Sequence, residues 1–357
     1  MNFLLSDDQT EVQSAVRRYF DKALPSSRLH RCFDAEAGFD TELWRGFAQI
    51  GVTAIALPED HGGLGLKLID LALVAEAVGA AAAPVPFLGH ALASLAIAWA
   101  GSEEQKSRWL PALAEGSVLA TIAFADAGGW QPEQWSLASA DRLLGSKRHV
   151  FAADVADLIV VGLAGGELAV IERNAAGLVV ADEGGIDRTR RLFTLTLEGT
   201  PAERLPEGAV QSARLRDAAL VLLAADAYGG AKRCLDLAVE YAKTRQQFGQ
   251  VIGRFQALKH QLANMAVEIE PARGLYWFAA YAFDDVQDRA AHSAALAKAH
   301  LTDRALQLAR DAVEAHGGIG YTWEYELHIW LKRAMLDYAW LGAPQEHRAR
   351  AADLAGW

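Results

Sequence analysis

The sequence predicts a mainly helical protein with a small β domain in its middle. Residues 1–117 and 209–357 carry apolar residues at the spacing of amphipathic helices. Between them, residues 118–208 contain short apolar runs bounded by glycine and aspartate, which is the pattern of strands. We therefore expect an N-terminal helical domain, a middle β domain and a C-terminal helical domain, without an internal repeat.

Composition and charge exclude several classes of protein. With 357 residues, of which 52% are hydrophobic, the chain can bury a large core. The net charge is −11 and no block is rich in Lys or Arg, which argues against binding to nucleic acid. Two cysteines, Cys32 and Cys234, cannot form a disulfide framework, and the ten histidines are scattered without metal-ligand spacing. We expect no metal site and a reducing, cytoplasmic location.

The N-terminal domain is expected to be helical from Ser6, a plausible N-cap, to about Glu115. The first residues turn acidic too soon for a secretory signal. Residues 77–101 lack charges and are long enough to span a bilayer, but Pro84 and Pro86 break the run, so we expect a buried helix and no membrane association.

The middle domain is expected to contain four strands with clear apolar patterns. These are DLIVVGL from Asp157, ELAVIE from Glu167, GLVVA from Gly177 and the alternating LFTLTLEG from Leu192.

The C-terminal domain is expected to contain long helices with a break at RQQFG, residues 245–249. Apolar residues before the break (Ala227, Ala231, Cys234, Ala238, Tyr241) and after it (Phe255, Leu258, Leu262, Met265, Ile269) step by three or four. Gly249 and Gly253 allow the turn. Arg245, in the last helical turn, either reaches a phosphate or only complements the helix end. A second break, GGIGY, precedes the helix LHIWLKRAMLDYAWL.

Four stretches together resemble the acyl-CoA dehydrogenase family. They are R-x-x-F-G-x-x-I-x-x-F-Q from Arg245, LPEDHGGLGL from Leu57, GSEEQKSRWLPALAEG from Gly101 and AVEAHGGIGYTWEYELHIWLKRA from Ala312. The resemblance implies a helical N-terminal domain, a β-barrel or β-sandwich and a C-terminal four-helix bundle that mediates oligomerisation. It also implies dehydrogenation of an acyl-CoA thioester by FAD, with electron-transfer flavoprotein as electron acceptor.

In this family FAD lies between two subunits, so each site has a cis half and a trans half. The trans half reaches the pyrophosphate and adenosine end of the neighbour's FAD, and the resemblance assigns to it Arg245, Phe248, Gln256, Glu314, Gly317 and Gly318. Glu314 stands where the family usually has Gln. The trans half is therefore expected to be intact.

The cis half departs from the family at several positions. Ala125 replaces the Thr that bonds the isoalloxazine ring, and the K-x-W-I-T-N segment reads from Lys147 to Ala152, with His149 and Phe151 at its flavin-lining places. The catalytic Glu of the Y-E-G-T motif has become Leu341, and Ala219 occupies the alternative position of that base. Asp217 and Asp226 are the nearest acids on the helix that carries Ala219.

This asymmetry predicts a small, base-lacking subunit of a hetero-oligomeric acyl-CoA dehydrogenase, which lends its trans half to FAD held by a larger catalytic partner. One alternative is a self-sufficient homo-oligomer that uses an unusual base, Asp217 or Asp226. Another is a flavin-free scaffold or acyl-CoA-binding protein, in which Arg245 is merely a helix-end cation.

Overall fold

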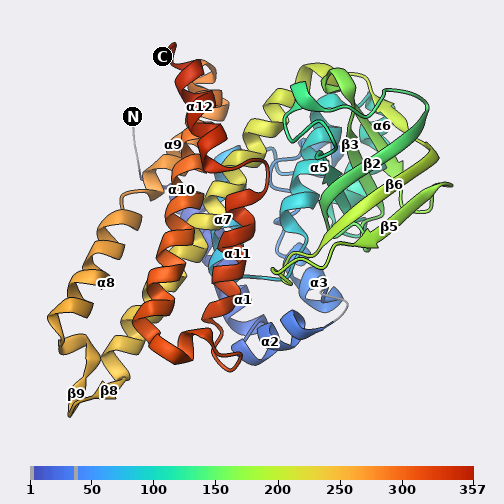
Figure 1. Cartoon of the computed structure of the whole chain (residues 1–357). Coiled ribbons are helices and arrows are strands. Elements are labelled where there is room, and N and C mark those ends of the chain that lie inside the picture. The colour runs from blue at the N-terminus through green and yellow to red at the C-terminus, as the bar shows by residue number, and fades with distance from the viewer. Residues whose placement is uncertain (1–3, 36–38) are drawn as a thin grey trace.

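The chain forms a helical N-terminal part, a β domain and a helical C-terminal part (Figure 1). The computed structural model describes residues 4–35 and 39–357. The predicted fold class, mainly helical with a middle β domain, is confirmed.

The N-terminal part is helical from the predicted cap onward. The side chain of Ser6 accepts a hydrogen bond from the backbone of Gln9, which closes a capping box. The uncharged run of residues 77–101 forms parts of two helices instead of one, because the chain leaves the first at Ala80 and enters the second after Pro86. No helix among the described residues is long and apolar enough to cross a membrane. The elements are α1 (Asp7–Ala23), α2 (Ser26–Asp34), α3 (Thr41–Gln49), η1 (Glu59–His61), α4 (Leu68–Ala80), α5 (Phe87–Ala100) and α6 (Glu103–Ala114).

The β domain consists of two sheets that share a small core. One sheet has the order β1-β3-β4-β7, with β1 parallel to β3, and the other has the antiparallel order β2-β6-β5. Residues such as Val150, Val161 and Leu195 fill the space between the sheets. The strands are β1 (Ala120–Ala123), β2 (Arg142–Phe151), β3 (Leu158–Gly162), β4 (Leu168–Glu172), β5 (Leu178–Asp182), β6 (Leu192–Pro201) and β7 (Glu203–Leu205), with η2 (Pro132–Gln134) and η3 (Ala164–Gly166) between them.

The C-terminal part is built around the long helix α7, which packs against α4 and α5 of the N-terminal part and against α10 and α11. The helix α8 and the hairpin of β8 and β9 extend away from the body of the molecule, at the lower left of Figure 1. The elements are α7 (Gly208–Thr244), β8 (Gln246–Gln247), β9 (Gln250–Val251), η4 (Ile252–Arg254), α8 (Gln256–Ile269), α9 (Arg273–Asp285), α10 (Gln287–His316), η5 (Gly317–Tyr321), α11 (Leu327–Ala339) and α12 (Pro344–Leu354).

A buried ionic network ties the β domain to the C-terminal helices. Arg190, from the loop between β5 and β6, donates to Asp337 of α11 at 2.5 Å and lies near Asp187 of its own loop. Arg333 of α11 makes a two-pronged bond to Asp226 of α7, at 2.9 and 2.6 Å. Loss of one partner would leave an uncompensated buried charge. The network therefore holds the loop between β5 and β6 against α7 and α11.

Candidate functional site

The break after α7 is a tight β-hairpin that presents an aromatic ring to solvent. Arg245 lies one residue beyond the helical turn in which we expected it, with extended backbone (φ −69°, ψ 128°) as the C-cap of α7. Phe248 and Gly249 form the two-residue turn between β8 and β9, and both have positive φ, 51° and 77°. A bulky side chain rarely adopts this conformation, and the ring of Phe248 is 90% exposed. Strain and an exposed aromatic side chain together indicate a functional position.

Positive charge accumulates beside this hairpin without a counter-charge. Arg245 is exposed, and no carboxylate of the described residues pairs with it. Helix α8 begins at Gln256, which is also exposed, and has no side-chain cap, so the first N–H groups of the helix are free. A guanidinium and the N-terminus of a helix are both suited to bind a phosphate.

The glycine-rich loop after α10 contains one glycine that the chain itself does not require. Gly317 has positive φ, 66°, and ends α10, while an added Cβ at Gly320 would come within 2.8 Å of the carbonyl of Val313. Gly318 has ordinary backbone angles, and an added Cβ would meet nothing within 4 Å. The missing side chain at position 318 therefore leaves room for a group from outside the chain.

The hairpin, α8 and the glycine-rich loop lie side by side. Tyr241, one turn before Arg245, stacks on His316 at the end of α10, with 4.5 Å between the ring centroids. Gln261 of α8 donates to the exposed Glu314 of α10 at 3.4 Å. The structure thus brings all six residues predicted for the trans half to one end of the C-terminal helices, and all six are exposed. The donors and the open glycine fit the phosphates of a dinucleotide.

The residues of the cis half pack on one another. The rings of Trp130, His149, Phe151 and Trp340 form an aromatic cluster: Trp130 stacks on His149, and Trp340 contacts Phe151 with 4.4 Å between centroids. The indole of Trp340 also donates to the carbonyl of His149 at 3.0 Å. Phe151 and Trp340 are 3% and 2% exposed. Phe151 and Trp340 are thus occupied by contacts within the chain, and His149 also pairs with Glu183 at 2.6 Å, so these side chains do not fit as an open cradle for an isoalloxazine ring.

A buried ion pair organises the loop next to this aromatic cluster. Lys147 donates to Asp126 at 2.7 Å and to the carbonyl of Phe124. Asp126 also accepts bonds from the backbone of Gly128 and Leu137. Burial alone would raise the pKa of Asp126, but these donors outweigh it and hold the pKa at about 2. The segment ADAGGW, residues 125–130, is thus fixed by its own structural interactions.

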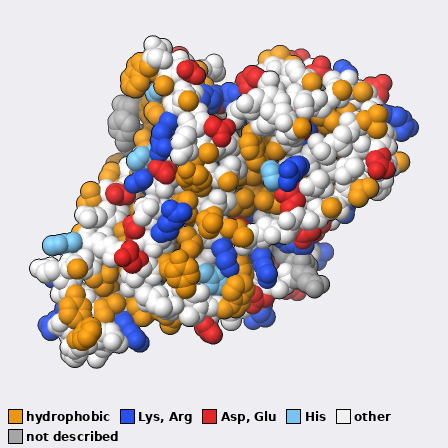
Figure 2. Space-filling model, viewed as in Figure 1, with side chains coloured by type: hydrophobic (Ala, Val, Ile, Leu, Met, Phe, Trp, Pro, Cys, Tyr) orange, Lys and Arg blue, Asp and Glu red, His pale blue; other side chains and the backbone are white. Residues whose placement is uncertain are grey.

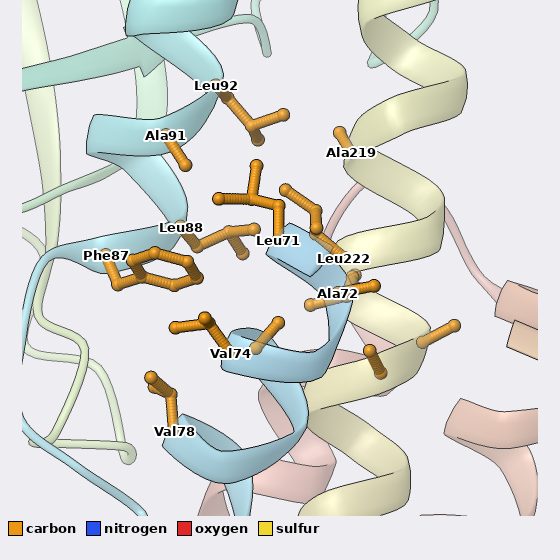
Figure 3. Close-up of a cluster of buried hydrophobic side chains, with 14 of the residues drawn as sticks. Leu71, Ala72, Val74, Val78, Phe87, Leu88, Ala91, Leu92, Ala219 and Leu222 are labelled. Carbon is orange, nitrogen blue, oxygen red and sulfur yellow. The ribbon is translucent and has the colours of Figure 1, made fainter. Parts of the chain in front are cut away.

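The two positions that the resemblance assigns to the catalytic base are buried and apolar. Leu341 is 1% exposed, with positive φ of 63°, and its carbonyl accepts bonds from His347 and Gln131. Ala219 on α7 is fully buried and faces Leu92 and Leu71, where α4, α5 and α7 pack together (Figure 3). Neither position carries a group that can abstract a proton.

The two aspartates considered as unusual bases are held in ion pairs. Asp226 bonds to Arg333, as described above, and although burial pushes its pKa up, the charges of Arg333 and Arg190 outweigh that effect and lower it. Asp217 lies between two guanidiniums, 3.1 Å from Arg216 and 2.7 Å from Arg350. A carboxylate whose oxygens are engaged by guanidinium groups is poorly placed to act as a general base.

Some residues of the cis region could not be found from the sequence. Gln131 and His347 both bind the carbonyl of Leu341, and Trp130 closes the aromatic cluster, yet the sequence assigned no role to any of the three. The sequence ADAGGW differs from the loop with which the family binds the flavin, but it does not indicate which side chains occupy that space.

Comparisons with known proteins agree with the fold and with the motifs. Residues 6–117 match the family "Acyl-CoA dehydrogenase, N-terminal domain" and residues 210–354 match "Acyl-CoA dehydrogenase, C-terminal domain". Acyl-CoA dehydrogenase IpdE2 of Mycolicibacterium smegmatis is 32% identical over 97% of this chain and 98% of that protein. IpdE2 of Mycobacterium tuberculosis is 35% identical over 95% of both chains.

Two similar solved structures are each named after two components. The Tcur3481-Tcur3483 steroid acyl-CoA dehydrogenase, in a G363A variant, superposes with a TM-score of 0.90 at 32% identity and 98% coverage of both chains. The ChsE4-ChsE5 complex from Mycobacterium tuberculosis gives a TM-score of 0.88 at 25% identity, covering 100% of this chain and 99% of that chain. Family matches, close relatives and fold agree: this chain belongs to the acyl-CoA dehydrogenase family.

Proposed function

We propose that this chain is a non-catalytic subunit of a hetero-oligomeric acyl-CoA dehydrogenase, and that it completes the FAD site of a larger catalytic partner. The observation that carries the proposal is the contrast between the two halves of the site. The trans residues Arg245, Phe248 and Gly318 are exposed, and no carboxylate among the described residues pairs with Arg245, whereas the cis residues are packed against one another.

FAD, held by the partner, would accept the hydride from the β carbon of an acyl-CoA thioester. In this chain, Arg245 would donate both arms of its guanidinium to the pyrophosphate, and the free N–H groups at the start of α8 would add partial positive charge. Gly318 would allow the backbone to approach the cofactor, and Phe248 would lie against its adenosine end. The partner would supply the base, since Leu341 and Ala219 cannot.

Three observations support a partner in place of a self-sufficient enzyme. The two candidate bases Asp217 and Asp226 are ion-paired. On α8, the predicted apolar stripe is only partly covered: Met265 and Ile269 are buried, but Leu258 and Leu262 remain accessible. Two of the similar structures are each named after two components. We propose a bulky, steroid-like acyl-CoA as substrate by analogy with the first of them, and electron-transfer flavoprotein as electron acceptor.

The proposal is tested by replacing Arg245 in the complex with the catalytic partner. Arg245→Glu replaces a cation that donates hydrogen bonds to the phosphate with an anion that repels it. The loss of one charge-assisted hydrogen bond typically costs about 1.5–3 kcal/mol, which corresponds to a tenfold or greater loss of FAD affinity. Arg45→Glu, at an exposed position on α3, makes the same charge change away from the hairpin. We expect FAD to be lost on dialysis from the first variant and retained by the second. Equal retention by both would leave Arg245 as a helix-end cation and contradict the proposal.

A further inference from the structure

A cavity of about 530 Å³ lies where the N-terminal helices meet the C-terminal helices. Residues of α1, α2, α4, α7, α9 and α11 line it, and three buried side chains, Phe20, Leu24 and Leu29, form its apolar wall. A cavity of about 300–1,000 Å³ with apolar walls and a few polar groups is the usual form of a small-molecule site. None of the residues assigned to either half of the FAD site lines this cavity.

The cavity is separate from the position to which the resemblance assigns the catalytic base. Tyr228, which lines the cavity, lies about 13 Å beyond Ala219 along the axis of α7. Around Ala219, the side chains of Leu71, Leu92 and Leu222 are buried where α4, α5 and α7 pack together (Figure 3). The cavity is therefore not an extension of the cis half.

Two guanidinium groups at the wall of the cavity share one carboxylate. Glu76 is 2% exposed and accepts hydrogen bonds from Arg17 at 2.6 Å and from Arg273 at 2.7 and 3.2 Å. The hydroxyl of Tyr276 also donates to Glu76. The two oxygens of Glu76 are thus fully used as acceptors. Because two positive charges face one negative charge, one positive charge is left without a counter-charge in this cluster.

Three side chains of the cavity have donors available for an anion. Arg17 uses only Nη2, and Nη1 of Arg273 has no hydrogen-bond partner within residues 4–35 and 39–357. Tyr228 is 2% exposed, and its hydroxyl forms no hydrogen bond with any residue that the structure describes. Burial raises the pKa of Tyr228 to about 12, so the hydroxyl keeps its proton and can donate it to an acceptor in the cavity.

The other carboxylates of the cavity are paired or exposed. Lys232 lies 2.5 Å from Asp236 and 3.5 Å from Glu270, and both carboxylates are about half exposed. Glu326 lies 3.5 Å from Arg233. Asp21 is exposed. Water and salt screen exposed charges, so these carboxylates oppose a bound anion only weakly.

The surface of the chain offers no general attraction for anions. On the face shown in Figure 2, Lys and Arg side chains are interspersed with Asp and Glu, without an extended basic patch. The net charge of the chain is −11. An anion would therefore be selected by the donors inside the cavity and not by the overall field of the protein.

We propose that this cavity binds a free carboxylic acid with an apolar body, whose carboxylate is held by Arg17, Arg273 and Tyr228. The bound carboxylate balances the second guanidinium, and the apolar body lies against the apolar wall. A thioester carries no negative charge at its carbonyl, so the cavity selects the free acid over the thioester. This binding site does not depend on the function proposed above.

Calorimetric titration of the full-length chain with decanoate, cholate and 1-decanol tests the proposal. We expect at least one of the two acids to bind, and 1-decanol to bind at least about tenfold more weakly than that acid, because the alcohol forms no charge-assisted hydrogen bond with a guanidinium. Decanoate and cholate carry the same carboxylate on a linear and on a polycyclic body. Their relative affinities identify the body that fits the apolar wall.

Two variants test the donors. Tyr228→Phe removes a hydroxyl that has no partner among the described residues, so it should leave the thermal stability unchanged and weaken acid binding about tenfold. Arg17→Gln should weaken binding at least as much, and it should fold because Glu76 keeps Arg273. Arg18→Gln is the matched control: Arg18 is the next residue of α1, forms an exposed ion pair of the same length, 2.6 Å, and does not line the cavity.

The proposal is overturned if neither acid binds at millimolar concentration, or if 1-decanol binds as tightly as the acids. It is equally overturned if Tyr228→Phe and Arg17→Gln bind the acid as tightly as Arg18→Gln. Arg245→Glu separates this cavity from the proposed flavin surface, since it should leave acid binding unchanged. Loss of acid binding in Arg245→Glu would show that the acid binds at the flavin surface instead.

Discussion

At the scale of single residues, the positions assigned to the cis half are engaged in contacts within the chain. The side chain of Lys147 is fully buried and that of Asp126 is 3% exposed, so each charge requires the other as its counter-charge. Asp126 fixes the loop to which the resemblance assigns flavin binding, and the aromatic cluster lies beside it. The same positions therefore contribute to the stability of this chain.

Replacing Asp126 by Asn should leave Lys147 buried without a counter-charge, which costs about 3–5 kcal/mol of unfolding free energy. Urea unfolding at pH 7 measures the loss. Arg108 and Glu203 form an ion pair of similar length at the surface, at 2.5 Å, and Glu203→Gln is expected to cost less than about 1 kcal/mol. Equal losses of unfolding free energy in the two variants would mean that the buried pair contributes no more to stability than the exposed pair.

The same pair predicts how stability depends on pH. The pKa of Asp126 is about 2 in the folded chain and near 3.8 when unfolded. Because the folded pKa is the lower one, the stabilisation is present above about pH 4 and is lost as the pH falls towards 2. In Asp126→Asn this part of the acid dependence should disappear. If the stability of the variant fell with decreasing pH as it does in the wild type, other carboxylates would control the acid dependence.

Installing the missing base at Leu341 should not create a dehydrogenase. A carboxylate there would be buried beside the aromatic cluster, with no flavin at a fixed distance, and general-base catalysis alone contributes about 10²–10⁴ in rate. We expect the purified Leu341→Glu chain to contain no flavin and to reduce no dye with any acyl-CoA. A yellow chain with robust turnover would mean that the cis half had been misinterpreted.

At the scale of elements, the hairpin and the glycine-rich loop have features that contacts within the described residues do not require. Phe248 is strained and exposed, and Gly318 faces open space. Gly253, which the sequence suggested as a turn residue, has a different role: its φ is not positive, and a Cβ there would come within 2.8 Å of the carbonyl of Ala242. It permits close packing of the hairpin end against α7.

Gly318→Ala should separate folding from cofactor binding. A methyl group there meets no atom of this chain, so the stability of the chain alone should change by less than about 0.5 kcal/mol. In the complex, the methyl group should hinder the cofactor and lower the FAD content. Gly320→Ala is the control, because its Cβ would press on the carbonyl of Val313 and destabilise the chain itself. Normal FAD retention in Gly318→Ala complexes would argue against close approach at this loop.

Elements with a strong apolar period could be predicted from the sequence, and those held by tertiary contacts could not. The strands β3, β4, β5 and β6 follow the predicted segments, since their inward side chains are apolar. Strand β2 carries Arg142, Lys147 and His149, so it shows no apolar run, and only its pairing with β6 makes it a strand. The hairpin strands β8 and β9 have two residues each, too few for any period to appear.

At the scale of the whole molecule, the sequence motifs predicted the fold correctly. The packing of the cis residues could be seen only in the structure. The sequence indicated that Leu341 and Ala219 replace the base. It did not indicate that Trp130, His149, Phe151 and Trp340 pack together, because contacts between segments so distant in the chain leave no local pattern. The buried network of Arg190, Asp226 and Asp337 is likewise invisible in the sequence, although it ties the β domain to α7 and α11.

The number of flavins in the complex tests the central claim most directly. We propose that each FAD site is completed by one copy of this chain and one catalytic partner. The complex, purified after co-expression with that partner, should therefore contain one FAD for every two polypeptides, measured by flavin absorbance after denaturation against the protein concentration. This chain purified alone should be colourless. A ratio near one FAD for each polypeptide, or a flavin-loaded chain without its partner, would contradict the account.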